Sequence, residues 1–104
     1  MRAEALKGHL DGLILATLAG GPAHGYAIAQ ALRARSGGTF DLPEGTLYPA
    51  LHRLERAGLI DSAWETASGR RRRTYRLTRA GQRGLESRRV EWRTFASAVD
   101  AVLA

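Results

Sequence analysis

The sequence predicts a mainly α-helical fold with one small β-hairpin, in the element order α-α-α-β-β-α. Apolar residues recur at the spacing of about 3.6 residues that lines one face of a helix, in three segments before residue 60 and in one after residue 78. Between these segments the period changes to short runs of strand-forming residues. With 104 residues, 44% of them hydrophobic, the chain suits one domain with a modest core.

Two amphipathic helices are expected in the first third of the chain. The first runs from about residue 4 to residue 19, and its apolar face consists of Leu6, Leu10, Leu13, Ile14 and Leu18. The Gly-Gly-Pro segment at residues 20–22 ends it. The second helix is expected from about His24 to Arg35, and its inward residues are Ile28, Ala31 and Leu32. The Ser-Gly-Gly segment at residues 36–38 breaks that helix.

The segment GTLYPALHRLERAGL, residues 45–59, predicts a third helix that contains a proline. Its inward residues are Leu47, Ala50, Leu51 and Leu54. Gly58 stands where a C-terminal cap belongs. A helix that starts at Pro43 would place Pro49 in its second turn, where a proline costs a hydrogen bond. A helix capped by Thr46 would place Pro49 where the N–H has no helical partner in any case, so the residues alone leave both starts open.

A hairpin and a long last helix are expected after the third helix. The strands are residues 60–66 and 72–78, and the Ala-Ser-Gly-Arg segment between them places Gly69 in a tight turn. Thr78 can cap the last helix. The apolar residues of that helix are Leu85, Trp92, Phe95, Ala96, Val99, Val102 and Leu103. Because several of them recur every seven residues, as in a coiled-coil seam, a partner helix is expected to cover them.

The composition favours a polyanionic partner. Sixteen Lys and Arg against ten Asp and Glu give a net charge of +6, and fifteen of the sixteen cations are Arg. Arginine makes forked contacts to phosphate and guanine that lysine does not. The absence of cysteine excludes disulfides, thiolate zinc sites and cysteine nucleophiles, and fits the cytoplasm. The apolar run at residues 13–19 is too short for a membrane span, and we expect it not to be an export leader.

No constellation of residues indicates an enzyme, a cofactor or a metal site. His9, His24 and His52 lie on different predicted elements, without a second histidine or a carboxylate at metal-ligand spacing. Each is therefore expected to be solvated or to cap a helix. The sequence contains no nucleophile elbow, phosphate-binding loop or dinucleotide-binding fingerprint. The glycine-rich segment at residues 20–25 lacks the Lys and Ser or Thr of a phosphate cradle and is expected to be a turn.

The outward face of the third helix and the hairpin together favour DNA binding. A helix rotates by about 100° per residue, and this rotation places seven residues on the outward face: Gly45, Thr46, Tyr48, Pro49, His52, Arg53 and Arg56. A small, hydroxylic and aromatic start followed by cations is typical of a recognition helix in the major groove. A solvated helix whose arginines pair with Glu55 explains this pattern equally well. Four arginines at residues 70–73, expected at the hairpin tip, favour DNA and complete a winged helix-turn-helix arrangement.

Three segments together resemble the PadR-like transcriptional regulators. They are HGYAI (24–28), GTLYPALHRLERAGLI (45–60) and GRRRRTYRLTRAG (69–81), in the order and at the spacings of that family. The resemblance covers nearly the whole chain. It implies a cytoplasmic winged-helix protein, usually a repressor, that dimerises through its C-terminal helix and binds palindromic operators. It also favours the longer, kinked third helix, although Pro43 stands where many members have a capping Ser or Asn.

The resemblance and the residue pattern define the candidate site. We expect DNA contacts from Tyr26, Thr46, Tyr48, Pro49, His52, Arg53, Arg56, Arg70, Arg71, Arg72 and Arg73. We expect a dimer interface or an effector pocket at Leu85, Trp92, Phe95, Val99 and Val102. The resemblance places Trp92 where some drug-responsive members line a cavity between subunits, so a small aromatic effector is a further hypothesis.

The expected organisation is a winged-helix DNA-binding domain over residues 1–77 and a C-terminal dimerisation helix over residues 78–104. The expected function is that of a sequence-specific, homodimeric DNA-binding regulator, with double-stranded DNA and a second copy of itself as partners and no membrane association. The alternative is a winged-helix interaction module whose basic hairpin binds an acidic protein. A gel shift against random duplex DNA separates the two, because a DNA binder has at least a non-specific affinity that falls steeply with salt.

Overall fold

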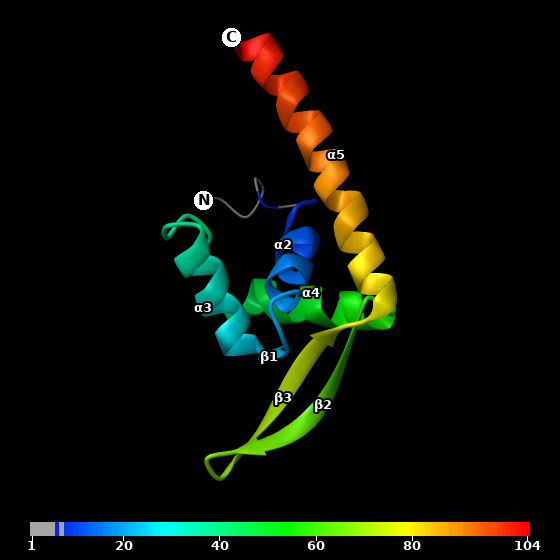
Figure 1. Ribbon diagram of the computed structural model, residues 1–104. Coiled ribbons are helices and arrows are strands. Elements are labelled where there is room, and N and C mark those ends of the chain that lie inside the picture. Colours follow the sequence, from blue (N-terminus) through cyan, green and yellow to red (C-terminus); the bar gives the residue numbers. More distant parts are fainter. Residues whose placement is uncertain (1–5, 7) are drawn as a thin grey trace.

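The computed structural model describes residue 6 and residues 8–104. Figure 1 shows the elements, which in chain order are α2 (Leu10–Leu18), β1 (Ala23–His24), α3 (Gly25–Arg35), α4 (Glu44–Arg56), β2 (Ile60–Ala67), β3 (Arg70–Leu77) and α5 (Arg79–Leu103). Helices dominate and the strands form one small antiparallel sheet. The predicted fold class, a winged helix-turn-helix with a long C-terminal helix, is confirmed.

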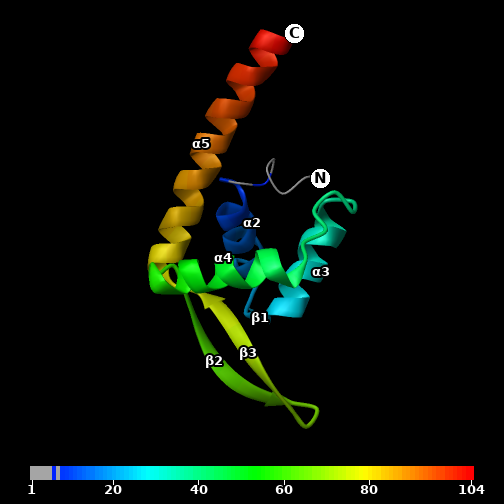
Figure 2. The same ribbon diagram turned by 180° about the vertical axis from the view of Figure 1, so that it is seen from behind.

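The molecule is elongated, with extents of 54 × 28 × 21 Å. Helices α2, α3 and α4 form a central body, from which the β2–β3 hairpin extends to one side and α5 to the other (Figures 1 and 2). We call this hairpin the wing. The free end of α5 and the tip of the wing therefore lie at opposite ends of the long axis.

One hydrophobic core unites the central body with the start of α5. Each of the helices α2 to α5 contributes residues, and Ile60 and Tyr75 add the base of the wing. The fully buried side chains of the core include Ile14, Leu15, Ile28, Leu47, Leu51, Leu54, Ile60 and Tyr75. Leu85 is the furthest residue along α5 that belongs to this core. The remaining turns of α5 carry no buried residue.

A turn at residues 8 and 9 interrupts the first predicted helix. The expected start near residue 4 falls among residues 1–5 and 7, which lie outside the described part of the chain. Gly8 has φ of +90°, a conformation that L side chains rarely adopt, and together with His9 it forms a turn before α2. The helix starts at Leu10, with His9 at the N-cap position. Leu6 and Leu10, on either side of this turn, are both buried. The apolar periodicity therefore continues across the turn, and the sequence pattern does not reveal it.

Helix α4 takes the longer of the two predicted forms. Pro43 is its N-cap, and the N–H groups of Thr46 and Leu47 both donate to the carbonyl oxygen of Pro43, at 3.0 and 3.1 Å. Pro49 therefore lies in the second turn and withholds a donor from the carbonyl of Gly45, which is exposed to solvent. The inward stripe predicted for this helix is fully buried, whereas its outward residues are exposed or half-buried.

The predicted hairpin is confirmed, with slightly different ends. Register runs from the Ile60–Leu77 pair to the Ala67–Arg70 pair. The two-residue loop consists of Ser68 and Gly69, with φ of 52° and 75°, as a tight hairpin turn requires. Strand β1 was not predicted; it has two residues, pairs antiparallel with β3 and makes the sheet order β1-β3-β2. It is too short to show a period of two, and it forms because the edge of β3 offers unpaired backbone groups.

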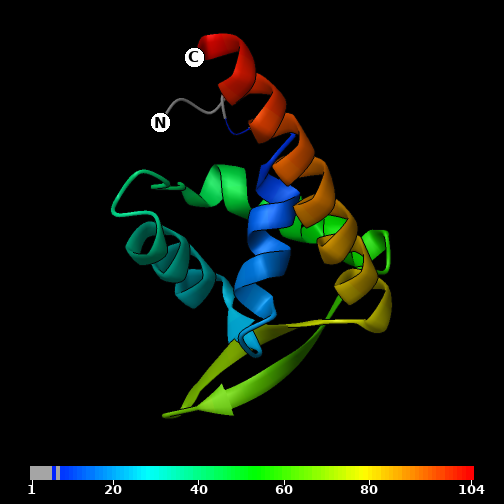
Figure 3. The same cartoon turned by 45° about the horizontal axis from the view of Figure 1, so that its top comes forward.

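Thr78 joins α5 to the end of α4, as its predicted capping role requires. Its Oγ1 accepts a hydrogen bond from the N–H of Gly81 at 3.0 Å and donates to the carbonyl oxygen of Gly58 at 2.7 Å. A Cβ on Gly81 would lie 2.0 Å from the carbonyl oxygen of Leu59, so only glycine permits this close approach. From this anchor α5 runs alongside α2 and then beyond the central body (Figure 3).

Candidate nucleic-acid interface

Three surfaces line an open groove of about 940 Å³: the wing, the start of α3 and the outward face of α4. We call it the wing groove. Eight of the eleven residues predicted to contact DNA line it, namely Tyr26, Tyr48, His52, Arg56, Arg70, Arg71, Arg72 and Arg73. The fold thus brings together residues that are up to 47 positions apart in the sequence (73 − 26).

The prediction that all four consecutive arginines lie at the tip of the wing is wrong. They run along β3. Arg70 pairs with Ala67 beside the loop, but Arg73 lies opposite Trp64, further along the strand. The cause is the short loop, which occupies only residues 68 and 69 and leaves the arginines to the strand. The charge therefore extends along the groove instead of being concentrated at one point.

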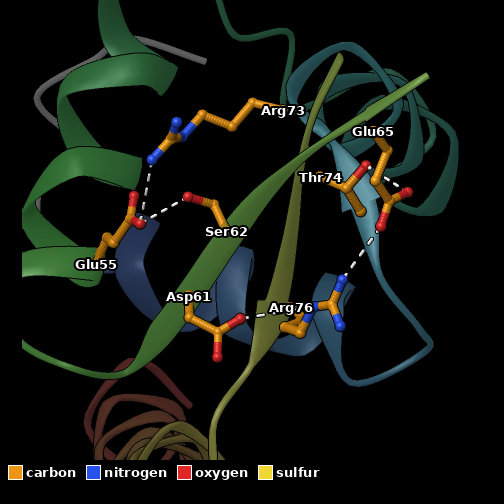
Figure 4. Close-up of polar contacts among 7 residues, drawn as sticks. All are labelled: Glu55, Asp61, Ser62, Glu65, Arg73, Thr74 and Arg76. Carbon is orange, nitrogen blue, oxygen red and sulfur yellow. Dashed lines mark hydrogen bonds and ion pairs between the residues drawn. The ribbon is translucent and has the colours of Figure 1, made fainter. Parts of the chain in front are cut away.

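Arginines on the two faces of the wing have different partners. On one face the guanidinium carbons of Arg71 and Arg73 lie 5.0 and 5.4 Å from the ring centroid of Trp64. On the other face Arg76 lies between Asp61 and Glu65, at 3.5 and 3.2 Å, and is neutralised by them (Figure 4). Among the described residues, Arg71 and Arg73 thus have no carboxylate partner on the wing itself, whereas Arg76 has two.

Glu55 connects the wing to α4. Its Oε2 accepts a hydrogen bond from Ser62 Oγ at 2.6 Å and lies 3.6 Å from Nη2 of Arg73, as Figure 4 shows. This carboxylate therefore joins the outward face of α4 to both strands of the wing. The sequence suggested Glu55 only as a partner for arginines of its own helix, because β2 and β3 approach it only in the folded chain.

The start of α3 forms the end of the groove. Of the two roles expected for His24, solvated or capping, the structure shows capping, since its Nδ1 accepts the N–H of Ala27 at 3.3 Å. Its Nε2 lies 3.1 Å from Nη1 of Arg72. Tyr26 is 65% exposed, stacks on His24 with 6.4 Å between ring centroids, and accepts a hydrogen bond from Gln30 at 3.0 Å. This edge of the groove therefore presents an exposed phenol beside an arginine.

Tyr75 lies under the groove, where it is 2% exposed. Burial raises the pKa of its hydroxyl, the positive charge of Arg73 lowers that pKa in part, and the negative charge of Glu55 raises it. A buried neutral phenol at this position supports the wing without adding charge to the groove.

Three predicted contact residues do not line the groove. Arg53 forms an ion pair with Asp11 of α2, and the same carboxylate lies 3.9 Å from Nη2 of Arg88 on α5. Asp11 thereby joins three helices. Thr46 is half-buried and Pro49 is exposed near the start of α4. For all three, contact with DNA stays a prediction.

A second groove, of about 650 Å³, lies between α2 and α5. We call it the α2–α5 groove. Trp92 meets His9 edge-on with 5.3 Å between ring centroids and lies 6.1 Å from Phe95. Trp92 and Phe95 are 53% and 56% exposed, and Val102 is 84% exposed. Leu85 also lines this groove but belongs to the core of its own chain, so it does not extend the exposed stripe.

Two absences concern only residue 6 and residues 8–104, the part of the chain that the structure describes. Among those residues, no cluster of three or more His, Cys, Asp or Glu side chains is arranged to hold a metal ion. None of the helices formed by residues 8–104 combines the length and the apolar character needed to cross a membrane.

Comparison with known proteins gives consistent matches along the chain. A model of the family described as "Transcriptional regulator PadR-like family" matches residues 14–87. An uncharacterised protein of Lysinibacillus sphaericus is 31% identical over 101 residues, which are 96% of this chain and 93% of that protein. A crystal structure of a PadR family transcription regulator from Clostridium difficile has a TM-score of 0.82 and 37% identity, and the match covers 93% of this chain and 100% of that one. A transcriptional regulator from Clostridium thermocellum has a TM-score of 0.87 at 29% identity, over 96% and 95% of the two chains.

Proposed function

The chain belongs to the PadR-like family of transcriptional regulators, and we propose that it regulates transcription by binding double-stranded DNA in the wing groove. One observation carries the proposal. The outward face of α4 and the arginines of β3 line the same groove, although they come from separate elements. A recognition helix with cations beside it is what duplex DNA requires, because base edges and phosphates lie next to each other.

The proposal assigns a role to each part of the groove. The first turns of α4 enter the major groove, where Thr46, Tyr48 and Pro49 meet base edges or sugars. Phosphates are met by the cations, with Tyr26 beside them. These cations are His52, Arg53, Arg56, Arg70, Arg71, Arg72 and Arg73. The proposed function includes no catalysis. Its place is the cytoplasm, where the DNA lies.

We further propose that the protein acts as a homodimer. Helix α5 has 25 residues, and its buried residues are Gly81 and Leu85. The stripe of Trp92, Phe95, Val99 and Val102 in its second half is apolar, and three of these four side chains are more than half exposed. A second copy of α5 would cover this stripe. The proposed division is therefore a DNA-binding domain at residues 1–77 and a dimerisation helix at residues 78–104.

A two-fold dimer leads to the finer parts of the proposal. Two related recognition helices read two half-sites in opposite directions, so the operator is a palindrome. Binding at a site that overlaps a promoter excludes the polymerase, which makes the protein a repressor. The α2–α5 groove, with Trp92 and Phe95 in its wall, suits a small aromatic effector that releases the dimer from DNA.

The test is a fluorescence anisotropy titration of a labelled random duplex at several salt concentrations. The protein should bind, and log Kd should rise linearly with log salt, by about 0.9 for each phosphate contacted. Replacing Arg71 and Arg72 with alanine should weaken binding to every duplex and flatten this slope by up to about two contacts.

Arg76→Ala is the control on the same strand, since it removes one arginine whose charge is already neutralised by Asp61 and Glu65. It should leave the slope nearly unchanged. A wild-type protein that binds no duplex at low salt would contradict DNA binding and favour the alternative, an interaction module with an acidic protein partner.

A further inference from the structure

Trp64 is an exposed aromatic residue in the middle of the wing. It lies on β2 directly opposite Arg73, and 56% of its surface is exposed, unlike Tyr75 on the neighbouring strand, which is buried in the core. An indole left open to solvent on a narrow hairpin contributes little to the core. It does line the wing groove, so its position relates to what enters that groove.

Two arginines share the ring of Trp64. The guanidinium carbon of Arg71 lies 5.0 Å from the ring centroid and that of Arg73 lies 5.4 Å from it. Both distances are within the ~6 Å at which a cation is attracted by the electron-rich face of an aromatic ring. Arg71 and Arg73 are two positions apart on β3, and so their side chains leave the strand on the same face.

The partner of an arginine decides what the arginine can still bind. On the other face of the wing, Arg76 is held by the carboxylates of Asp61 and Glu65, which neutralise its charge and lie against its Nε and Nη2 atoms. An aromatic ring orients a guanidinium without adding negative charge, and it leaves the N–H groups at the edge of the guanidinium free to donate. Within the described residues, no carboxylate lies within salt-bridge distance of Arg71.

We propose that Trp64 is a positioning residue for DNA binding, which holds Arg71 and Arg73 over the wing groove in the conformation that meets phosphate. The inference rests on the proposed function, because it assumes that the ligand of the groove is DNA. A free arginine side chain loses conformational freedom when it binds a phosphate, whereas one already stacked on an indole has less to lose. Glu55 restrains Arg73 from the side of α4, at 3.6 Å, so Arg71 depends on Trp64 more than Arg73 does.

The test compares Trp64→Ala, Trp64→Leu and Trp64→Phe with the wild-type protein by anisotropy on a random duplex. Trp64→Ala and Trp64→Leu should raise Kd about fivefold or more, since two exposed cation–π contacts are lost. Trp64→Phe should restore most of the affinity, because it keeps an aromatic face. The salt slope should stay close to that of the wild type in every variant, since none changes a charge. A purely structural role would not distinguish leucine from phenylalanine.

A double-mutant cycle separates positioning from direct contact. In a chain that already carries Arg71→Ala and Arg73→Ala, Trp64→Leu should have no further effect on Kd. An additive loss would show that Trp64 touches DNA itself, and equal affinities of the Leu and Phe variants would show that aromaticity is irrelevant. Either result overturns the inference while the proposed function stands. If the wild type binds no duplex, the proposed function fails and the inference with it.

Circular dichroism and a thermal melt establish that the variants are folded. Because the side chain is more than half exposed, we expect all three to fold. If Trp64→Ala does melt early, the comparison of Trp64→Leu with Trp64→Phe still decides the matter, since both fill most of the same space.

Discussion

The phenol ring of Tyr48 on α4 lies against the backbone of Gly25 at the first position of α3. A Cβ added to Gly25 would come within 2.7 Å of the Tyr48 hydroxyl oxygen and 3.0 Å of its Cε1 atom. Glycine at this position therefore makes the space that the tyrosine occupies in the wing groove. Tyr48 is 37% exposed, so one side of its ring rests on α3 while the rest remains open to a ligand.

Gly25→Ala should displace Tyr48 without unfolding the protein. The clash is with the far end of a side chain that can rotate, and Gly25 does not have a positive φ, so alanine is compatible with the helix. We expect a normal circular dichroism spectrum together with weaker binding to cognate DNA. The Gly25→Ala/Tyr48→Ala double variant should bind no more weakly than Tyr48→Ala alone. A further loss in the double variant would show that Gly25 acts through another neighbour.

Tyr48→Ala should lower affinity for the cognate site more than for random duplex. The expected difference is about 1–3 kcal/mol if the tyrosine meets a base edge. The fold should survive, because Tyr48 lies off the buried stripe of Leu47, Leu51 and Leu54. Competition titrations with specific and random duplex measure the difference. Equal losses on both duplexes would assign Tyr48 to the sugar–phosphate backbone, and loss of the folded state would show that it is a core residue.

Asp11→Asn should release Arg53 for phosphate binding. Asp11 forms an ion pair with Arg53 and lies 3.9 Å from Arg88, so this carboxylate holds a cation of the recognition helix toward α2. Without the charge of Asp11, the phosphate contact proposed for Arg53 no longer competes with the ion pair, and the salt slope on random duplex should steepen by up to about 0.9. Stability should fall by no more than about 1 kcal/mol, because the pair is partly exposed. The matched control is Asp61→Asn, which removes one carboxylate from Arg76 on the wing while Glu65 still holds that arginine. A slope that Asp11→Asn leaves unchanged would place Arg53 away from DNA.

Replacing Gly81 or Gly84 of α5 with alanine should have opposite effects on the stability of the fold. A Cβ on Gly81 would lie 2.0 Å from the backbone oxygen of Leu59, which cannot move without undocking α5. A Cβ on Gly84 would meet its nearest neighbour at 3.5 Å, an ordinary contact. Gly81→Ala should therefore destabilise the fold by about 1–3 kcal/mol, as overpacking does. Gly84→Ala should stabilise it by up to about 1 kcal/mol through helix propensity. Urea unfolding measures both, and equal midpoints would contradict the tight docking of α5.

The elements with a strong period were predictable from the sequence. The four inward residues of α4 are separated by steps of three, one and three positions, which only a helix places on one face, and all four are buried. The hairpin was recognisable because Gly69 lies in the turn between two runs of strand-forming residues. The break at Gly8 was not, because Leu6 and Leu10 remain on a common buried face across the turn.

The candidate site was predictable where a residue acts through its own element and not where it acts through a distant one. The outward face of α4 follows from helical geometry alone. The pairing of Arg53 with Asp11 spans 42 positions, and the stacking of Arg71 and Arg73 on Trp64 depends on the register of two strands. A sequence pattern shows neither of these spatial contacts, so the roles of Asp11 and Trp64 were not predicted. The signal that could have identified Trp64 is an aromatic residue in the strand facing an arginine run.

Trp92→Ala should shift the protein toward monomer and weaken operator binding with it. Trp92 is 53% exposed on α5 and lies 6.1 Å from Phe95, so it is the largest apolar side chain of the stripe left open to a partner. Truncating a central aromatic residue of an interface typically removes more binding energy than any neighbouring change. Sedimentation equilibrium measures the dimer, with Val90→Ala as the control, since Val90 is 52% exposed on the same helix but lies off the stripe. A Trp92→Ala dimer that stays intact but no longer leaves DNA with an aromatic effector would instead make Trp92 a stacking platform for that ligand. A wild-type protein that is monomeric at micromolar concentration would contradict both roles, because each requires a second α5.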